Sequence, residues 1–322
     1  MKAALFKAYG NEGSVVVEET HAPVPDENGI LIHVKATTVT AVDALFRSGT
    51  GFFARMATGI IKPKISILGT ELSGVVESVG NKVTGFKKGD EVIADSGTHY
   101  GAHAEYVTVD ENDPIVHKPE NLPFEQAAAV SYGSLTALAF LRDNGKIKKG
   151  DRVLIIGASG SVGTYAVQLA KYYGAEVTGV CSEQNTALVK SLGAEHIIDY
   201  RKTDLGDLDD SFDIIFDTVG KYSFNKTRHL LKPDGTYLTT VLSLRSAFDL
   251  LKTRRSRQKS ILALTGLRKN EEKTEDLRFI ADLFKNQRLT AVIDRKFTLD
   301  EISDAFDYVA QGHKTGNVVI TV

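Results

Sequence analysis

The chain has 322 residues, of which 42% are hydrophobic and 25% are charged. This composition is ordinary for a globular protein, and the length is enough for two domains. The formal net charge of −2 excludes a strongly basic or acidic protein and predicts neither a nucleic-acid nor a membrane partner. The single cysteine, Cys181, excludes an intrachain disulfide and a four-cysteine zinc site.

The N-terminal sequence MKAALFKAYG lacks the apolar core of a signal peptide. The longest apolar stretch, residues 127–141, is interrupted by serine, glycine and threonine, so it does not resemble a membrane span. We therefore expect a cytoplasmic protein in a reducing compartment.

Residues 1–113 consist of short segments rich in β-branched residues, separated by Gly, Asn, Asp and Pro. This pattern predicts an antiparallel, barrel-like β domain. Three prolines then cluster in DPIVHKPENLP, which neither a helix nor a central strand tolerates well. We expect the chain to cross into a second domain there.

The stretch from Asp151 to Tyr200 organises the second domain. It begins with a β-branched run at residues 152–156, which predicts a parallel strand buried on both faces. Three glycines, Gly157, Gly160 and Gly163, then open a segment with apolar residues at helical spacing, and a second apolar strand follows at residues 177–181. Such a strand, glycine turn, helix and strand can hold a dinucleotide, because the free N–H groups at the helix start bind phosphate.

Further elements alternate along the rest of the chain. We predict a helix at residues 124–142, broken near Tyr132 and Gly133, and others at residues 223–231 and 276–284. Strands are expected at residues 196–199, 213–217, 236–241 and 261–264. This alternation predicts an α/β fold with a doubly wound parallel sheet.

The C-terminal residues are expected to return to the β domain. Thr298 and Glu301 have capping-box spacing before a helix that places Ile302, Phe306 and Val309 on one face, and NVVITV forms a final strand. We therefore assign residues 1–120 and 288–322 to the β domain and residues 121–287 to the cofactor domain.

Residues 245–273 carry nine Lys or Arg against three Asp or Glu. A solvated face is the simpler interpretation of this segment. An anion or nucleic-acid patch is the alternative, but the segment lacks the interleaved aromatic residues expected of single-strand binding.

Several motifs together carry a family resemblance. GASGSVG, CSEQN, SLGAEHIIDY and FDIIFDTVG resemble the zinc-independent branch of the medium-chain dehydrogenase/reductase superfamily, the quinone oxidoreductase and enoyl reductase-like group. The similarity covers almost the whole chain. It implies a GroES-like catalytic domain, a Rossmann cofactor domain and a possible homodimer.

The glycine turn and the resemblance together predict the residues that bind a nicotinamide dinucleotide. These are Thr136, Ala158, Ser159, Gly160, Ser161, Val162, Gly163, Ser182, Asn185, Tyr200, Asp217, Val219, Gly220, Val241 and Asn317.

The end of the second strand of the dinucleotide unit indicates which cofactor binds. Enzymes of this architecture that use NAD place an acidic residue there, about twenty residues past the glycines, for the ribose hydroxyls. Here that end reads Val180, Cys181, Ser182, which leaves room for the 2′-phosphate of NADPH. Glu183 opposes this choice, so the phosphate would depend on Arg201 or Lys202 for its countercharge. We predict NADPH, with NADH as the alternative.

Zinc-dependent members of the superfamily hold a catalytic metal at positions that correspond to Thr40, Thr70 and Tyr132 of this chain. Three hydroxyls do not suit Zn²⁺, which favours thiolate and imidazole. We predict no metal site.

A reductase without a metal Lewis acid needs an acceptor that is already activated, such as a quinone or an α,β-unsaturated carbonyl compound. Thr40 and Tyr132 are the candidate donors to the developing enolate oxygen. By comparison with the family, Leu45, Phe52 and Phe53 would make an apolar pocket, and solvent could supply the proton.

Two other functions remain open from the sequence. One is a metal-free NAD(P)-dependent alcohol or aldehyde dehydrogenase. The other is a protein that binds NADPH without turnover.

Overall fold

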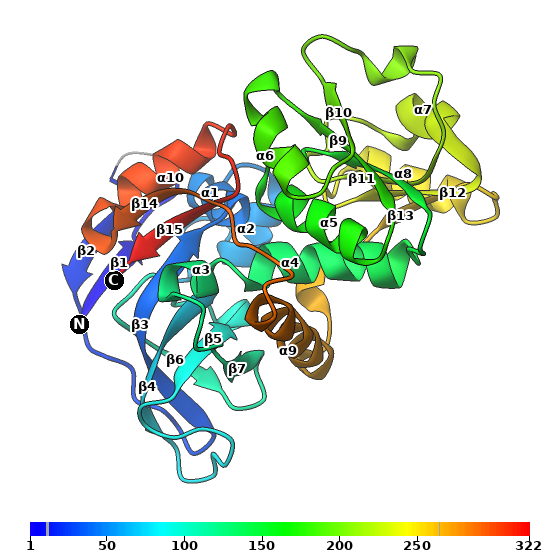
Figure 1. The fold of residues 1–322 in the computed structure, drawn as a ribbon. Helices are drawn as coiled ribbons and strands as arrows, with labels where there is room; N and C mark the ends of the chain where they lie inside the picture. Colours follow the sequence, from blue (N-terminus) through cyan, green and yellow to red (C-terminus); the bar gives the residue numbers. More distant parts are fainter. Residues whose placement is uncertain (11–12, 264) are drawn as a thin grey trace. The chain divides into compact units, whose positions relative to one another are not determined.

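The computed structural model describes residues 1–10, 13–263 and 265–322. It divides into two compact units, one of Met1–Tyr132 with Lys269–Val322 and the other of Gly133–Arg268. Both chain ends belong to the first unit (Figure 1). The sequence analysis assigns residues 121–132 and 269–287 to the cofactor domain, whereas the structure groups them with the first unit.

That difference has a simple cause in packing. Helix α3 (Phe124–Ala128) lies against strands β3 (Gly29–Val39) and β4 (Glu71–Val79), and helix α9 (Asn270–Lys285) lies against β7 (Ile115–His117). Both helices therefore cover the β domain, although they stand next to the cofactor domain in the sequence.

The first unit is built on a seven-stranded sheet in the order β14-β15-β3-β4-β5-β7, with β6 paired to β3. A separate hairpin joins β1 to β2. All pairs are antiparallel except β14 with β15. The remaining strands of the unit are β1 (Lys2–Phe6), β2 (Val15–Glu19), β5 (Glu91–Asp95), β6 (Tyr106–Asp110), β14 (Ile293–Thr298) and β15 (Asn317–Thr321), and its other helices are α1 (Ala41–Ser48), α2 (Phe52–Thr58) and α10 (Ile302–Ala310).

Two apolar clusters hold this unit together. Alternate residues of β3, Ile30, Ile32 and Val34, are fully buried in one cluster, as expected for a strand with one face inward. Ile302, Phe306 and Val309 of α10 lie in the other cluster. The capping box predicted at Thr298 and Glu301 is present before α10, so the sequence prediction for this helix is confirmed.

The second unit contains a six-stranded parallel sheet in the order β10-β9-β8-β11-β12-β13, which confirms the predicted Rossmann architecture. Its strands are β8 (Arg152–Ile156), β9 (Glu176–Cys181), β10 (His196–Asp199), β11 (Phe212–Asp217), β12 (Leu231–Thr239) and β13 (Lys259–Leu262). Its helices are α5 (Ser161–Tyr172), α6 (Thr186–Ser191), α7 (Phe224–Thr227) and α8 (Leu244–Thr253), with α4 (Ser131–Leu138) and a π-helix (Ala139–Asn144) leading into them. Short 3-10 turns cover residues 97–99, 183–185, 205–207, 228–230, 265–267 and 299–301.

Two predicted boundaries were wrong. The helix break lies at Ala129 and Val130, between α3 and α4. Gly133 lies inside α4, where a Cβ atom would meet the Tyr165 ring at 2.8 Å. Strand β12 begins at Leu231 rather than at residue 236, and its pairing with β11 shifts register inside the strand: Leu231 pairs with Phe212 and Thr236 with Ile214. The strand predicted at residues 261–264 is β13, which covers Lys259–Leu262. Residue 264 lies outside the described residues.

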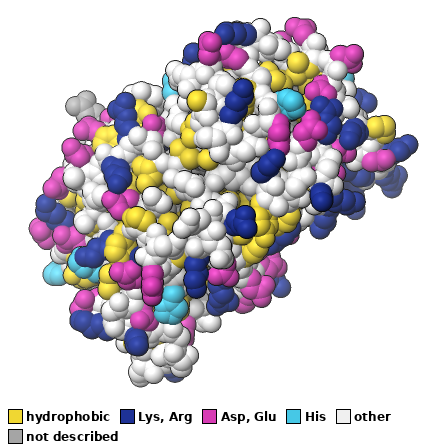
Figure 2. Space-filling view, in the orientation of Figure 1, with side chains coloured by type: hydrophobic (Ala, Val, Ile, Leu, Met, Phe, Trp, Pro, Cys, Tyr) yellow, Lys and Arg dark blue, Asp and Glu magenta, His cyan; other side chains and the backbone are white. Residues whose placement is uncertain are grey.

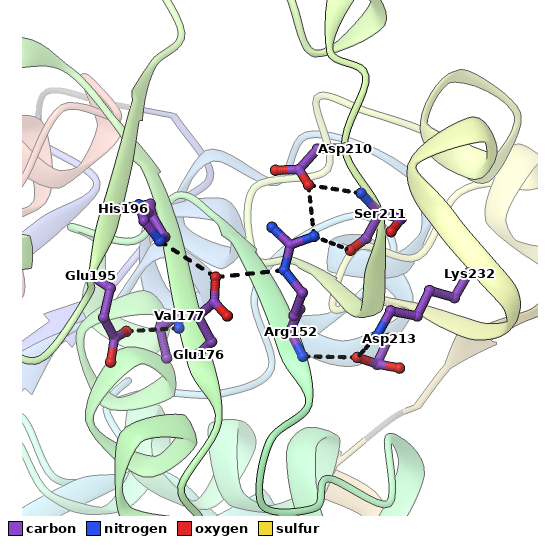
Figure 3. Close-up of polar contacts among 9 residues, drawn as sticks. All are labelled: Arg152, Glu176, Val177, Glu195, His196, Asp210, Ser211, Asp213 and Lys232. Carbon is purple, nitrogen blue, oxygen red and sulfur yellow. Dashed lines mark hydrogen bonds and ion pairs between the residues drawn. The ribbon is translucent and has the colours of Figure 1, made fainter.

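A charged network joins the amino ends of five of the parallel strands, β8 to β12 (Figure 3). The Arg152 guanidinium donates to Asp210 Oδ1 at 2.7 Å and lies 3.5 Å from Glu176 Oε1. The backbone N–H of Arg152 donates to Asp213 Oδ2 at 2.8 Å, and His196 Nε2 lies 3.4 Å from Glu176. These residues lie at the sheet edge opposite the carboxyl ends of the strands, so we assign them to fold stability.

Candidate functional site

The glycine turn lies at the carboxyl end of β8. Gly157 has φ +81°, a conformation that glycine adopts without strain, and the N–H groups of Gly157 and Ala158 donate to Val180 O at 3.1 and 3.0 Å. These bonds tie the turn to the end of β9. Gly160 caps α5, whose first residues are Ser161, Val162 and Gly163.

Gly160 and Gly163 have different surroundings. A Cβ atom at Gly163 would lie 2.0 Å from Gly157 O, so only glycine lets α5 sit this close to the turn. A Cβ atom at Gly160 would meet only Gly157 O, at 3.4 Å. The described residues thus leave room beside Gly160, as a backbone cradle for a pyrophosphate requires.

The loop after β9 is fastened to the glycine turn by a side-chain contact. Asn185 Nδ2 donates to Ser159 Oγ at 3.0 Å, and the Asn185 N–H donates to Ser182 O at 2.9 Å. The structure thus brings together Ser159, Ser182 and Asn185, three of the predicted cofactor residues, at one edge of the sheet. Ser182 is buried, and Ala158 is fully buried beneath the turn.

Tyr200 follows β10, also at the carboxyl ends of the strands, and two cationic side chains lie near its ring. The Arg201 guanidinium lies 5.8 Å from the centre of the Tyr200 ring, and Lys221 Nζ lies 5.7 Å from it. Lys202, the other predicted countercharge, pairs instead with Glu183 at 2.9 Å. Among the described residues, Arg201 and Lys221 have no carboxylate partner, so both keep their charge available to an anion.

Asp217 ends β11 and shapes the loop that follows. Its Oδ1 accepts from the N–H groups of Val219 and Gly220 at 2.9 and 2.8 Å. Its Oδ2 accepts from the Tyr222 N–H and from the Tyr237 hydroxyl at 3.1 and 3.0 Å. Burial raises the pKa of Asp217, and these donors oppose the shift. The carboxylate is turned into the protein, so Asp217 acts by positioning the loop.

The loops after β11 and β12 meet at Gly220. Gly220 has φ +77°, and a Cβ atom there would lie 2.6 Å from a Val241 methyl group. Val219 and Val241 remain partly exposed at 47% and 38%. Together they offer apolar contact surface at the carboxyl edge of the sheet, where doubly wound folds bind ligands.

Thr136 and Asn317 are both buried and already have contacts. Thr136 Oγ1 lies 3.4 Å from Thr265 Oγ1 inside the second unit. Asn317 begins β15 in the first unit, and its Nδ2 donates to Val292 O at 3.1 Å. That bond holds the Asn317 amide group in place, so its predicted contact with a cofactor stays a prediction.

Thr40 is the N-cap of α1 in the first unit. Its hydroxyl donates to Asp43 Oδ2 at 2.6 Å and accepts from the Asp43 N–H at 3.2 Å, which completes a capping box. The hydroxyl hydrogen of Thr40 is thus already committed to a carboxylate.

Near this cap lies a buried carboxyl group that the sequence analysis missed. Glu71 Oε1 accepts from the Thr38 hydroxyl at 2.6 Å, and Oε2 accepts from the Tyr132 N–H at 2.9 Å. Burial raises the pKa of Glu71 to about 8, although both donors lower it. The available signal was a charged residue directly before the mostly apolar segment LSGVV of β4.

Two groups that interact with Glu71 also have shifted pKa values, mainly because they are buried. Burial, with smaller contributions from Glu71 and Asp43, raises the pKa of Tyr132 to about 12, so its hydroxyl keeps its proton. Burial lowers the pKa of Lys314 to about 8, and Glu71 opposes that shift. Lys314 Nζ donates to Gly316 O at 2.6 Å.

The residues at the zinc-ligand positions do not fit zinc. Thr40, Thr70 and Tyr132 offer only hydroxyl oxygens, and that of Thr40 is bound to Asp43. Among the residues that the structure describes, no group of three His, Cys, Asp or Glu side chains could hold a metal ion.

Two other sequence predictions can be compared with the structure. No described helix is both long and apolar enough to span a bilayer. Of the residues predicted to line an apolar pocket, Leu45 is exposed at 44%, and the side chains of Phe52 and Phe53 lie outside the described residues.

Comparison with known proteins places this geometry in a family. A model described as "Alcohol dehydrogenase GroES-like domain" matches residues 26–120, and one described as "Zinc-binding dehydrogenase" matches residues 192–320. The mitochondrial NAD(P)H oxidoreductase RTN4IP1 of Mus musculus is 34% identical over 92% of this chain and 82% of its own. The chain belongs to the medium-chain dehydrogenase/reductase superfamily.

Two further relatives place the chain within this superfamily. The chloroplastic NADPH-dependent alkenal/one oxidoreductase of Arabidopsis thaliana is 31% identical over 99% of this chain and 79% of its own. The solved quinone oxidoreductase of Coxiella burnetii is 31% identical, with a TM-score of 0.90 over 100% of this chain and 99% of that chain. The predicted family, with its quinone oxidoreductase and enoyl reductase-like members, is confirmed. Independence of zinc stays a prediction that rests on the hydroxyl donor set.

Proposed function

We propose that this medium-chain reductase transfers hydride from NADPH to quinones or to α,β-unsaturated carbonyl compounds, without a metal. Relatives with these activities in their names support the reaction class. The observation that carries the choice of cofactor is the pair of cations at Tyr200. Arg201 and Lys221 supply positive charge at the edge of the sheet that holds the glycine turn.

The residues of the second unit suit the phosphates of such a cofactor. The turn at Gly160 and the first N–H groups of α5 would hold the pyrophosphate. Ser182 begins the loop after β9, and the one carboxylate of that loop, Glu183, pairs with Lys202 at 2.9 Å. The acidic residue that opposes NADPH in the sequence thus has a cation, Lys202, beside it. NADPH, when bound, supplies the hydride.

The first unit offers the groups that can stabilise a reduced product. When an enone accepts hydride at its β-carbon, negative charge develops on the carbonyl oxygen and requires a hydrogen-bond donor. Tyr132 keeps its proton up to a pKa of about 12 and is suited to that role. The Thr40 hydroxyl donates to Asp43 instead, so we propose Tyr132 as the donor and Thr40 as the cap of α1.

Conjugated acceptors are favoured because their transition-state charge can be stabilised by hydrogen bonds alone. The test is a panel of quinones, enones and the matching saturated carbonyl compounds, followed by NADPH absorbance. We expect much higher kcat/KM for each conjugated substrate than for its saturated counterpart. Efficient oxidation of simple alcohols with no quinone or enone turnover would contradict the proposal, and cofactor binding with no turnover at all would favour a non-catalytic protein.

Zinc content provides an independent test. We expect dialysed, active enzyme to contain no stoichiometric zinc and to keep its activity in a chelator. Stoichiometric zinc whose removal abolishes turnover would show that the hydroxyl donor set is not the whole metal environment.

A further inference from the structure

The loop of residues 218–222, which follows β11, extends from the glycine turn to Tyr200. A Cβ atom at Gly157 would lie 2.3 Å from a methyl group of Val219, so the start of the loop packs directly on the glycine turn. The end of the loop carries Lys221, whose Nζ lies 5.7 Å from the centre of the Tyr200 ring. One short loop therefore connects the turn suited to a pyrophosphate with the cations suited to a 2′-phosphate.

A single buried side chain fixes the backbone on both sides of Lys221. Asp217 Oδ1 accepts from the Gly220 N–H at 2.8 Å, and Asp217 Oδ2 accepts from the Tyr222 N–H at 3.1 Å. Asp217 is fully buried, and Gly220 and Tyr222 are the residues directly before and after Lys221. Ordering a short loop costs conformational entropy, which these two bonds offset before any ligand binds.

Tyr237 holds the Asp217 carboxylate from the neighbouring strand. It lies on β12, where it pairs with Ile215 of β11. Its hydroxyl donates to Asp217 Oδ2 at 3.0 Å and lies 3.1 Å from Tyr222 O. Burial and then the charge of Asp217 raise the pKa of Tyr237, so the hydroxyl keeps the hydrogen that it donates. Because Tyr237 is only 2% exposed, bulk water does not compete for this bond.

A phosphate site on this protein has to depend on particular cations. The formal net charge is −2, and on the face that Figure 2 shows, Lys and Arg side chains lie among Asp and Glu side chains. The surface as a whole therefore gives an anion little attraction. Lys221 is exposed, and its long side chain loses entropy when it binds an anion. Its contribution thus depends on how firmly the loop beneath it is held.

We propose that Asp217 and Tyr237 are positioning residues that set the selectivity of this enzyme for a 2′-phosphorylated dinucleotide, by holding Lys221 beside Tyr200. Asp217 acts through the backbone of the loop, and Tyr237 acts through Asp217. A negative residue can favour an anion in this way because three N–H groups and one O–H group already surround its oxygens. The inference rests on the proposed function, since it takes NADPH as the cofactor.

The experiment titrates the full chain and its Tyr237→Phe variant with NADPH, NADH, 2′,5′-ADP and 5′-AMP. Phenylalanine keeps the ring that packs edge-on against Phe224, so the fold should persist. We expect the affinity for NADPH and 2′,5′-ADP to fall about threefold to tenfold, and that for NADH and 5′-AMP to change less than about twofold. Asp217→Asn should act in the same direction with a larger effect, because an amide nitrogen cannot accept from the loop N–H groups.

A double-mutant cycle tests whether Tyr237 acts through the lysine. Tyr237→Phe should lower NADPH affinity in the wild type but change it little when Lys221→Met is already present, because the two side chains serve one contact. Tyr308→Phe is the matched control. It also removes a tyrosine hydroxyl that donates to an aspartate, Asp294 of the first unit, at 2.6 Å. This control should leave the ratio of NADPH to NADH affinity unchanged.

Three outcomes would overturn the proposal. Tyr237→Phe with an equal loss of NADPH and NADH affinity, or with no loss of either, would leave Asp217 and Tyr237 a structural role alone. Additive effects of Tyr237→Phe and Lys221→Met would show that Tyr237 does not act through the lysine. Equal binding of NADPH and NADH by the wild type would contradict the choice of cofactor itself, so a failure of the proposed function is visible before any variant is measured.

Discussion

Lys221 places its ammonium nitrogen 5.7 Å from the centre of the Tyr200 ring, although the two residues follow strands that are not neighbours in the sheet. Tyr200 follows β10 and Lys221 lies beyond β11, and β9 and β8 stand between these strands. The lysine therefore reaches across the carboxyl edge of the sheet to the ring. It joins Arg201 there, so two cations that are distant in the sequence meet over one aromatic side chain.

We predict that Lys221→Met weakens NADPH binding by about tenfold and leaves NADH binding unchanged, because one charge-assisted contact to the 2′-phosphate is lost. Fluorescence titration with both cofactors under one set of conditions measures this difference. A comparison of 2′,5′-ADP with 5′-AMP isolates the phosphate. Lys226→Met, an exposed lysine of α7, is the matched control and should change neither affinity. An equal loss of NADH affinity would show that Lys221 acts on the adenosine itself.

The backbone geometry of the glycine turn could be predicted from the sequence because its determinants are local. A glycine turn between a strand and a helix is encoded within a few residues, and the contacts at Gly157, Gly160 and Gly163 follow from backbone sterics. Lys221 could not be found in this way. Its proximity to Tyr200 depends on the order of the strands in the sheet, which periodicity does not reveal.

In the first unit, too, the sequence does not reveal which side chains contact one another. Thr40 and Tyr132 were both predicted as donors because they occupy zinc-ligand positions of the family. The structure shows that the two hydroxyls differ, since the Thr40 hydroxyl donates to Asp43, three residues away. Glu71 was missed because its partners, Thr38 and Tyr132, are 33 and 61 residues distant.

Two glycine substitutions should separate fold from cofactor binding. Gly163→Ala should destabilise the protein by about 1 to 3 kcal/mol, because its Cβ atom would meet Gly157 O at 2.0 Å. Gly160→Ala should change stability by less than about 0.5 kcal/mol, because its Cβ atom has 3.4 Å to that oxygen, but it should weaken NADPH binding about tenfold or more. Urea denaturation and cofactor titration of both variants check this. Normal NADPH affinity in Gly160→Ala would mean that the pyrophosphate does not approach this residue.

Glu71 should make stability depend on pH. Its pKa is raised to about 8 in the folded protein, so the folded state holds the proton more tightly than the unfolded chain. The stability from protonated Glu71 is fully present below the ordinary pKa of a glutamic acid and is lost as pH rises through about 8, by on the order of a few kcal/mol.

The variant Glu71→Gln should remove this dependence, because its amide stays neutral and can keep the contacts with Thr38 and Tyr132. Urea denaturation between pH about 5 and 8 should give a shallower decline for the variant than for the wild type. Asp217 and Asp95, whose pKa values are also raised by burial, are present in both proteins and cancel in the comparison. Lys314 has the opposite effect on stability above pH 8. Its pKa is lowered to about 8 in the folded protein, so its contribution to stability increases as the pH rises further. If the free energies of unfolding of the wild type and the variant change with pH in parallel, Glu71 is ionised throughout this range.

The last prediction assigns different roles to the two hydroxyls of the first unit. Tyr132→Phe should lower kcat for an enone by on the order of a hundredfold while leaving stability nearly unchanged, because a transition-state donor is lost. Thr40→Val should do the reverse: it removes the cap of α1 and should cost about 1 kcal/mol of stability, with a small effect on kcat. Steady-state kinetics and urea denaturation of both variants measure the two effects together. A large loss of kcat in Thr40→Val with an intact rate in Tyr132→Phe would show that the Thr40 hydrogen turns away from Asp43 toward substrate. Unchanged kcat in both variants would remove the two hydroxyls from catalysis and indicate that solvent protonates the product.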